Sequence, residues 1–155
     1  MVTKMTKVIK NKSGFTLIEL MIVVSIIAVS TAIAVPTFLS WAPKFRLNSG
    51  ADKLGKDLMV ARISAISQNS SVVVEFFESQ RKYRIKYKDK TEVRELPVGV
   101  HFSGIGTSTI TFNHIGQADV NVIIKLYSDS NKLTDKKRKV TVRAVTGIAR
   151  VTRGW

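Results

Sequence analysis

The stretch that most constrains the fold is an apolar run of 27 residues from Phe15 to Trp41. Between Phe15 and Pro43 the only charged residue is Glu19. As a helix, this run would be about 40 Å long, which exceeds the roughly 30 Å of hydrocarbon in a bilayer. We therefore expect a membrane-spanning helix within residues 15–43.

A signal peptide is the alternative interpretation of an apolar run near the N-terminus. Its apolar core is usually shorter, and a cleavage site of small residues follows it. Here the small residue Gly14 precedes the run, which favours an anchor. The residues before the run include four lysines and no acid, and this pattern favours a cytoplasmic N-terminus and export of the rest.

Glu19 is a functional candidate, because an ionised carboxylate in a membrane helix is costly and needs a reason. It lies four residues beyond Phe15, about one helical turn. If the chain were cut after Gly14, the new amine of Phe15 could neutralise this carboxylate, within one subunit or between neighbours. The alternative is a carboxylate that snorkels to the headgroups. Pro36 lacks an amide hydrogen and should kink or locally melt the helix.

The residues Gly14-Phe15-Thr16-Leu17-Ile18-Glu19 resemble the prepilin-peptidase motif of type IV pilins and type II secretion pseudopilins. The resemblance extends to the short basic leader and to Pro36, the twenty-second residue after the junction. It implies that prepilin peptidase cleaves between Gly14 and Phe15 and that the Phe15 amine is N-methylated. It also implies that Glu19 pairs with the N-terminus of a neighbouring subunit during filament assembly.

After the apolar run, an apolar stripe at steps of three and four residues predicts an amphipathic helix. The stripe consists of Leu47, Ala51, Leu54, Leu58, Ala61 and Ala65. The period changes near residue 70, and strict alternation over residues 82–88 predicts a strand that forms a hairpin with residues 72–77. We expect further strands at residues 92–96, 100–102, 109–113, 120–127, 140–145 and 148–152, and a polar, mobile loop at residues 128–139.

Many short strands at close spacing favour an antiparallel β-sandwich. The predicted fold class is therefore α+β, a long N-terminal pilin helix packed on a β-sandwich. We expect a cleaved leader at residues 1–14 and a transmembrane or filament-core helix at residues 15–43. Residues 44–155 should form a periplasmic globular domain, with helix to about residue 67 and the sandwich from about residue 70.

Three later segments resemble the GspH/FimT subfamily of minor pilins and pseudopilins. They are residues 54–66 with the strand that follows, the segment from Phe112 to Gly116, and the segment from Val145 to Val151. The resemblance implies a structural subunit that is held in the inner membrane and then extracted into a periplasmic filament. Its partners would be other subunits and secreted cargo. Secretion pseudopili and type IV pili share all of these motifs.

The sequence nominates no catalytic or metal site. It has no cysteine, which excludes disulfides and thiolate chemistry, and its only histidines are His101 and His114. It contains no nucleophile elbow, P-loop or His-Glu-x-x-His motif. We therefore expect a protein that is not an enzyme and that has no cofactor and no metal.

The formal net charge is +14, and removing the four leader lysines would leave about +10, which indicates an acidic partner. Seven cations and no acid follow Asp135, and Trp155 could stack on a base. Some FimT-like pilins that resemble this chain bind DNA through such a tail, although Ile148 replaces the first arginine of their ending. The alternative is a solvated basic face that meets an acidic subunit. The candidate DNA-binding residues are Lys137, Arg138, Arg143, Arg150 and Arg153.

Overall fold

The structure is a computed structural model that describes residues 14–130 and 136–154. The chain divides into two compact units, residues 1–37 and residues 38–155. One helix, α1 (Leu17–Ser67), contributes to both units. The expected leader lies outside the described residues except for Gly14.

In the first unit, the described residues form the apolar part of α1. The side chains from Phe15 to Thr37 are all exposed. Three hydroxyls in this segment donate to the carbonyl oxygen four residues earlier, which satisfies them within the helix. These bonds are Ser25 to Met21 at 2.8 Å, Thr31 to Ile27 at 2.7 Å and Thr37 to Ile33 at 3.1 Å. In the described part of the chain, α1 is the one helix long and apolar enough to cross a membrane.

The helix continues without a break through Pro36, Pro43, Gly50 and Gly55. The expectation that Pro36 could locally melt the helix is therefore not met. The kink at Pro36 stays a prediction.

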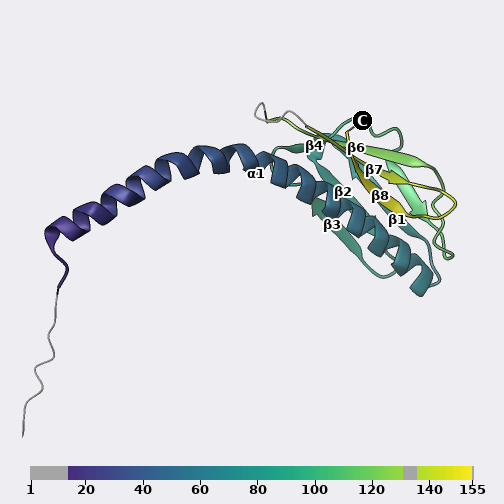
Figure 1. The fold of residues 1–155 in the computed structure, drawn as a ribbon. Helices are drawn as coiled ribbons and strands as arrows, with labels where there is room; N and C mark the ends of the chain where they lie inside the picture. The colour runs from purple at the N-terminus through teal and green to yellow at the C-terminus, as the bar shows by residue number, and fades with distance from the viewer. Residues whose placement is uncertain (1–13, 131–135, 155) are drawn as a thin grey trace, which may run out of the picture. The chain divides into compact units, whose positions relative to one another are not determined.

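The second unit contains two four-stranded antiparallel sheets (Figure 1). Sheet A has the order β3-β2-β1-β5 and sheet B has the order β4-β6-β7-β8. Their strands are β1 (Val72–Phe77), β2 (Lys82–Lys86), β3 (Thr91–Glu95), β4 (Val100–Phe102), β5 (Thr109–Phe112), β6 (Val122–Ser128), β7 (Lys137–Val142) and β8 (Ala149–Arg153). A short 3-10 helix, η1 (Glu78–Gln80), joins β1 to β2. The predicted fold class is confirmed.

One core holds this unit together. Alternate residues of β1, β2, β6 and β7 are buried, as period-two alternation requires. The second half of α1 adds its predicted stripe, and Leu47, Leu54 and Leu58 are at most 1% exposed. Figure 1 shows this half of the helix lying along the strands.

The prediction for residues 128–139 was wrong at both ends. Strand β6 includes Ser128, and β7 already begins at Lys137, so the predicted strand at 140–145 starts three residues too late. Pairing with β6 explains the difference, because Tyr127 faces Lys137 and Lys125 faces Lys139 in the ladder. Residues 131–135 lie outside the described residues.

Candidate functional site

The N-terminal candidate site is an exposed, non-helical segment directly before α1. Gly14, Phe15 and Thr16 have no regular secondary structure, and Phe15 is 85% exposed. A Cβ atom added at Gly14 would meet no atom within 4 Å. The fold therefore leaves the bond between Gly14 and Phe15 accessible and imposes no packing requirement on it.

Thr16 caps α1. The backbone amide of Glu19 donates to the Thr16 hydroxyl at 3.2 Å, which satisfies one of the amides that a helix leaves unpaired at its start. Thr16-Leu17-Ile18-Glu19 has the spacing of a capping box. The sequence analysis did not identify this capping signal. The cap places the Glu19 carboxylate in the first turn of α1, where the helix dipole favours negative charge.

The five candidate DNA-binding residues do not form one surface. Arg143 and Arg150 line the same hollow of about 340 Å³ beside the outer face of sheet B. Lys139, which the sequence analysis did not nominate, lines it too. In the described part of the chain, no carboxylate forms an ion pair with these three cations. The threonines Thr141, Thr146 and Thr152 complete the lining with Ile148.

The other candidates lie elsewhere. Lys137 lines a separate hollow beside Tyr127, and Arg153 lines one with Asn48 and Asp52. Arg138 is buried, and its Nε donates to Asn48 Oδ1 at 2.8 Å. Arg138 is therefore a structural residue rather than a surface contact, which corrects its place in the candidate set. Trp155 lies outside the described residues.

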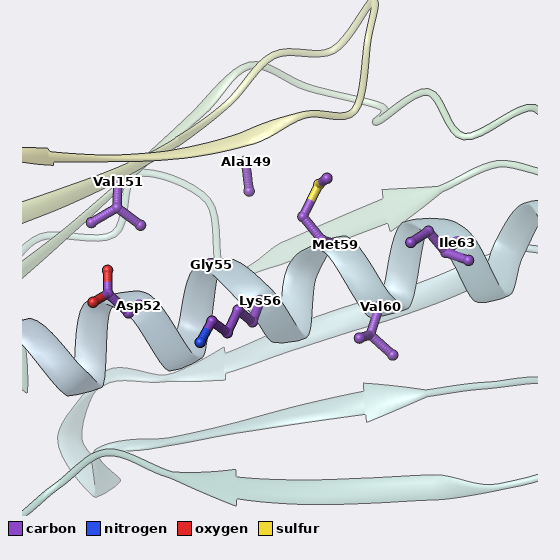
Figure 2. Close-up of a pocket in the computed structure, with 8 residues that line it drawn as sticks. All are labelled: Asp52, Gly55, Lys56, Met59, Val60, Ile63, Ala149 and Val151. Atoms are coloured by element: carbon purple, nitrogen blue, oxygen red, sulfur yellow. The ribbon is translucent and has the colours of Figure 1, made fainter.

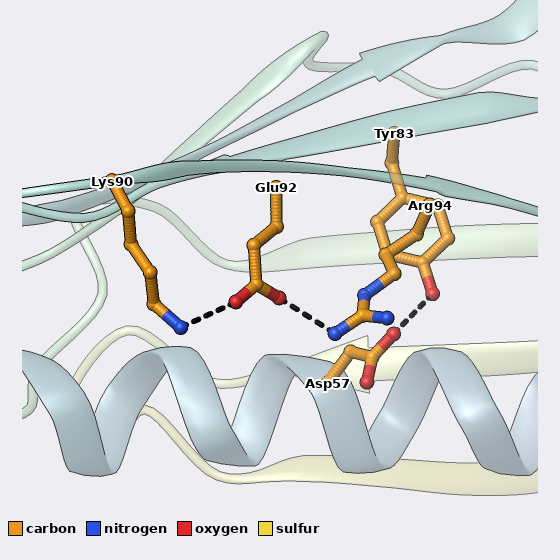
Figure 3. Close-up of polar contacts among 5 residues, drawn as sticks. All are labelled: Asp57, Tyr83, Lys90, Glu92 and Arg94. Carbon is orange, nitrogen blue, oxygen red and sulfur yellow. Dashed lines mark hydrogen bonds and ion pairs between the residues drawn. The ribbon is translucent and has the colours of Figure 1, made fainter.

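A polar cluster fastens α1 to the edge of sheet A (Figure 3). The hydroxyl of the buried Tyr83 donates to Asp57 Oδ2 at 2.5 Å. Burial, together with this bond to a carboxylate, raises the pKa of Tyr83 far above its usual range. Beside it, Glu92 pairs with Arg94 at 2.6 Å and with Lys90 at 2.5 Å. Glu92 is paired with two cations and Asp57 accepts the Tyr83 hydroxyl, so the cluster serves to pack α1 on sheet A.

Arg62 of α1 joins two loops that are far apart in sequence. Its Nε donates to the carbonyl oxygen of Gly116 at 3.0 Å. A Cβ atom added at Gly147 would overlap this same carbonyl oxygen and come within 3.0 Å of the Arg62 side chain. The loop after β5 and the loop after β7 therefore meet at Arg62, and all three of the later segments singled out in the sequence lie together.

The two histidines show no site chemistry. His101 stacks on Tyr127 with ring centroids 5.4 Å apart and lies 3.3 Å from Asp129 Oδ2. His114 is exposed. Within residues 14–130 and 136–154, no group of three or more His, Asp or Glu side chains could hold a metal ion.

Comparison with known proteins bears on this N-terminal segment first. Residues 9–35 match the family described as the prokaryotic N-terminal methylation motif, and this range contains Gly14, Phe15 and Glu19. A fimbrial protein of Pseudomonas aeruginosa is 33% identical over 82 residues, which is 53% of this chain and 53% of that protein. The chain thus spans about half the length of the fimbrial proteins that it matches.

Solved structures share the fold. The minor pseudopilin EpsH of the Vibrio cholerae type 2 secretion system superposes with a TM-score of 0.57 at 12% identity, over 70% of this chain and 97% of EpsH. The type IV minor pilin FimU of P. aeruginosa superposes with a TM-score of 0.55 at 15% identity, over 68% of this chain and 92% of FimU. This chain carries the N-terminal methylation motif and has a pilin-like fold.

In this chain, the N-terminal site was visible in the sequence because its residues are neighbours along the chain. The hollow that joins Lys139, Arg143 and Arg150 was not, because it depends on the pairing of β7 with β8. The one signal available was alternation, since Lys139 and Thr141 are two residues apart in one strand.

Proposed function

We propose that this pilin-like protein is a minor structural subunit of a type II secretion pseudopilus or a type IV pilus, of the GspH/FimT type. The observation that carries the proposal is the junction of Gly14 and Phe15, which is exposed and directly precedes an apolar helix with Glu19 in its first turn. Prepilin peptidase would cleave this junction, and the Phe15 amine would be methylated.

The proposed subunit has no catalytic role. Its residues 15–43 would anchor it in the bacterial inner membrane and later pack in the filament core. Residues 44–155 would lie in the periplasm and contact other subunits or secreted cargo. The 33% identity to a fimbrial protein over 53% of this chain, together with the folds of EpsH and FimU, supports this assignment.

Glu19 has the central role in assembly under this proposal. Its carboxylate lies one turn from Phe15, and an ion pair with the amine of a neighbouring subunit would remove two charges from an apolar core. The described residues give Glu19 no side-chain ion pair of its own. This leaves the carboxylate available to a neighbour.

The test is incorporation of Glu19→Ala into sheared filaments, measured by immunoblot against the membrane-bound pool. We expect incorporation to fall at least about ten-fold, while the melting temperature of the full chain in detergent stays unchanged. Leu20→Ala is the matched control, because it changes the same turn and keeps the carboxylate. Normal incorporation of Glu19→Ala would contradict the proposed role.

DNA binding is a second candidate, favoured by one observation. Lys139, Arg143 and Arg150 line one hollow without carboxylate partners among the described residues, and such an arrangement suits phosphate groups. A gel shift with duplex DNA should then weaken steeply with salt and disappear in an Arg143→Ala, Arg150→Ala variant. Arg153→Ala, outside this hollow, should bind normally.

A further inference from the structure

Strand β8 is an edge strand whose free side can be located from its ladder. It pairs with β7 alone among the described strands. Gly154 N donates to Lys137 O at 3.2 Å, and Arg143 N donates to Ile148 O at 3.4 Å. Antiparallel ladders alternate bonded and non-bonded pairs, so the amides of Arg150 and Thr152 also face β7. The backbone groups of Ala149, Val151 and Arg153 therefore point away from the sheet.

An apolar groove lies on the inner side of this edge (Figure 2). It has a volume of about 590 Å³ and lies between β8 and α1. Ala149 and Val151 line it from β8, while Met59, Val60 and Ile63 line it from the helix. Val60 and Ile63 are 51% and 56% exposed, so this face of α1 has no partner within the described residues. Gly55 allows α1 to approach β8 closely, because a Cβ atom at this position would lie 2.9 Å from Val151 Cγ2.

The outer side of the same edge is basic. Arg150 and Thr152 line the hollow that also holds Lys139 and Arg143. The Thr152 hydroxyl is buried and has no hydrogen-bond partner among the described residues. One short strand thus separates an apolar groove from a cationic hollow, and its free backbone groups lie between the two.

We propose that β8 docks an extended segment of a different protein, one that alternates apolar and acidic side chains. Such a segment would bond to the free groups of Ala149, Val151 and Arg153 as a fifth strand of sheet B. Period-two alternation would send its apolar side chains into the groove over Met59 and Ile63. Its acidic side chains would meet Arg150 and Lys139.

A second copy of this chain fits the surface poorly. The sequence of β8 is Ala-Arg-Val-Thr-Arg, so pairing two copies would bring arginines together without an acid. A nucleic acid would use the cations but neither the apolar groove nor the strand edge. The proposal concerns a partner of the globular unit, and it holds whether or not Glu19 acts in assembly as proposed above.

The probe is a fluorescent peptide of about seven residues in which glutamate and valine alternate. Its binding to the full chain in detergent is measured by fluorescence polarisation. Two control peptides have the same length. One groups the glutamates and valines into two blocks, and the other alternates lysine and valine. We expect the alternating acidic peptide to bind at least about ten-fold more tightly than either control.

Ala149→Pro tests the strand edge. Ala149 is the first residue of β8, and its amide points away from β7. Proline is tolerated at such a position, so the sheet should persist. We expect the affinity to fall at least about ten-fold with little change in melting temperature. Val93→Pro, on the free edge of β3 in sheet A, is the matched control and should bind normally.

Arg150→Glu tests the charge. This substitution should lower the affinity for the alternating acidic peptide and raise the affinity for the lysine-valine peptide by a similar factor. Equal binding of the block peptide, or unchanged binding to Ala149→Pro, would overturn the proposal in favour of simple charge attraction.

Discussion

At the scale of single residues, Gly147 shows how one position can join two distant loops. It has a φ of +61°, a conformation that residues with a Cβ atom rarely adopt. Its neighbours are Gly116 from the loop after β5 and Arg62 from α1. A side chain at this position would displace the hydrogen bond between Arg62 and Gly116.

Gly147→Ala should therefore destabilise the protein by about 2–4 kcal/mol, the sum of backbone strain and a disrupted buried contact. The measurement is urea unfolding of the full chain in detergent. Gly104→Ala is the matched control, because Gly104 also has a positive φ but a Cβ atom there meets nothing within 4 Å. It should cost about 1 kcal/mol, and equal costs for both variants would contradict the steric account.

Tyr83 should make stability depend on alkaline pH. Its folded pKa is raised by burial and by Asp57, so the unfolded chain loses this proton first, near pH 10. The stabilisation is complete below that pH and is lost above it, by up to about 1.4 kcal/mol per pH unit. From pH 8 to 11, the free energy of unfolding should fall less steeply with pH in Tyr83→Phe than in the wild type. Tyr127→Phe, which changes an exposed ring, should follow the wild type.

At the scale of elements, β7 explains where the sequence prediction failed. Its first three residues are Lys137, Arg138 and Lys139, a composition typical of a loop. The strand forms because β6 pairs along it and because Asn48, 90 positions earlier, accepts a hydrogen bond from Arg138. Neither partner is visible in a local window.

Substitutions of Arg138 and Arg143 should consequently have different effects on stability. Arg138→Ala should lower the free energy of unfolding by about 1–3 kcal/mol, because it leaves Asn48 unpaired and removes buried stem atoms. Arg143→Ala changes an exposed residue directly after β7 and should alter this free energy by less than about 0.5 kcal/mol. Chemical denaturation of both variants decides this, and a larger effect of Arg143→Ala would refute the assignment.

At the scale of the whole molecule, the N-terminal segment should be processed independently of the fold. A Cβ atom at Gly14 meets nothing, so Gly14→Val should leave the globular unit intact. We expect the native protein to begin at a methylated Phe15, and the variant to begin at Met1. Intact mass and N-terminal sequencing of both, from native membranes, measure this. An unprocessed wild type in cells with active prepilin peptidase would contradict the expectation.

The sequence by itself determined the features that rest on neighbouring residues. The membrane-length apolar run, the motif around Phe15, the amphipathic stripe of α1 and the alternation of β2 all follow from composition and spacing along the chain. These features were enough to predict the fold class and the N-terminal site.

Only the tertiary structure decided the features that depend on which strands pair. It buried Arg138, gathered Lys139, Arg143 and Arg150 around one hollow, and made β8 an edge. The physical reason is that each depends on contacts between residues far apart in the chain. Whether a basic residue is exposed or buried depends on the partner that the fold brings to it. Local sequence propensity does not identify that partner.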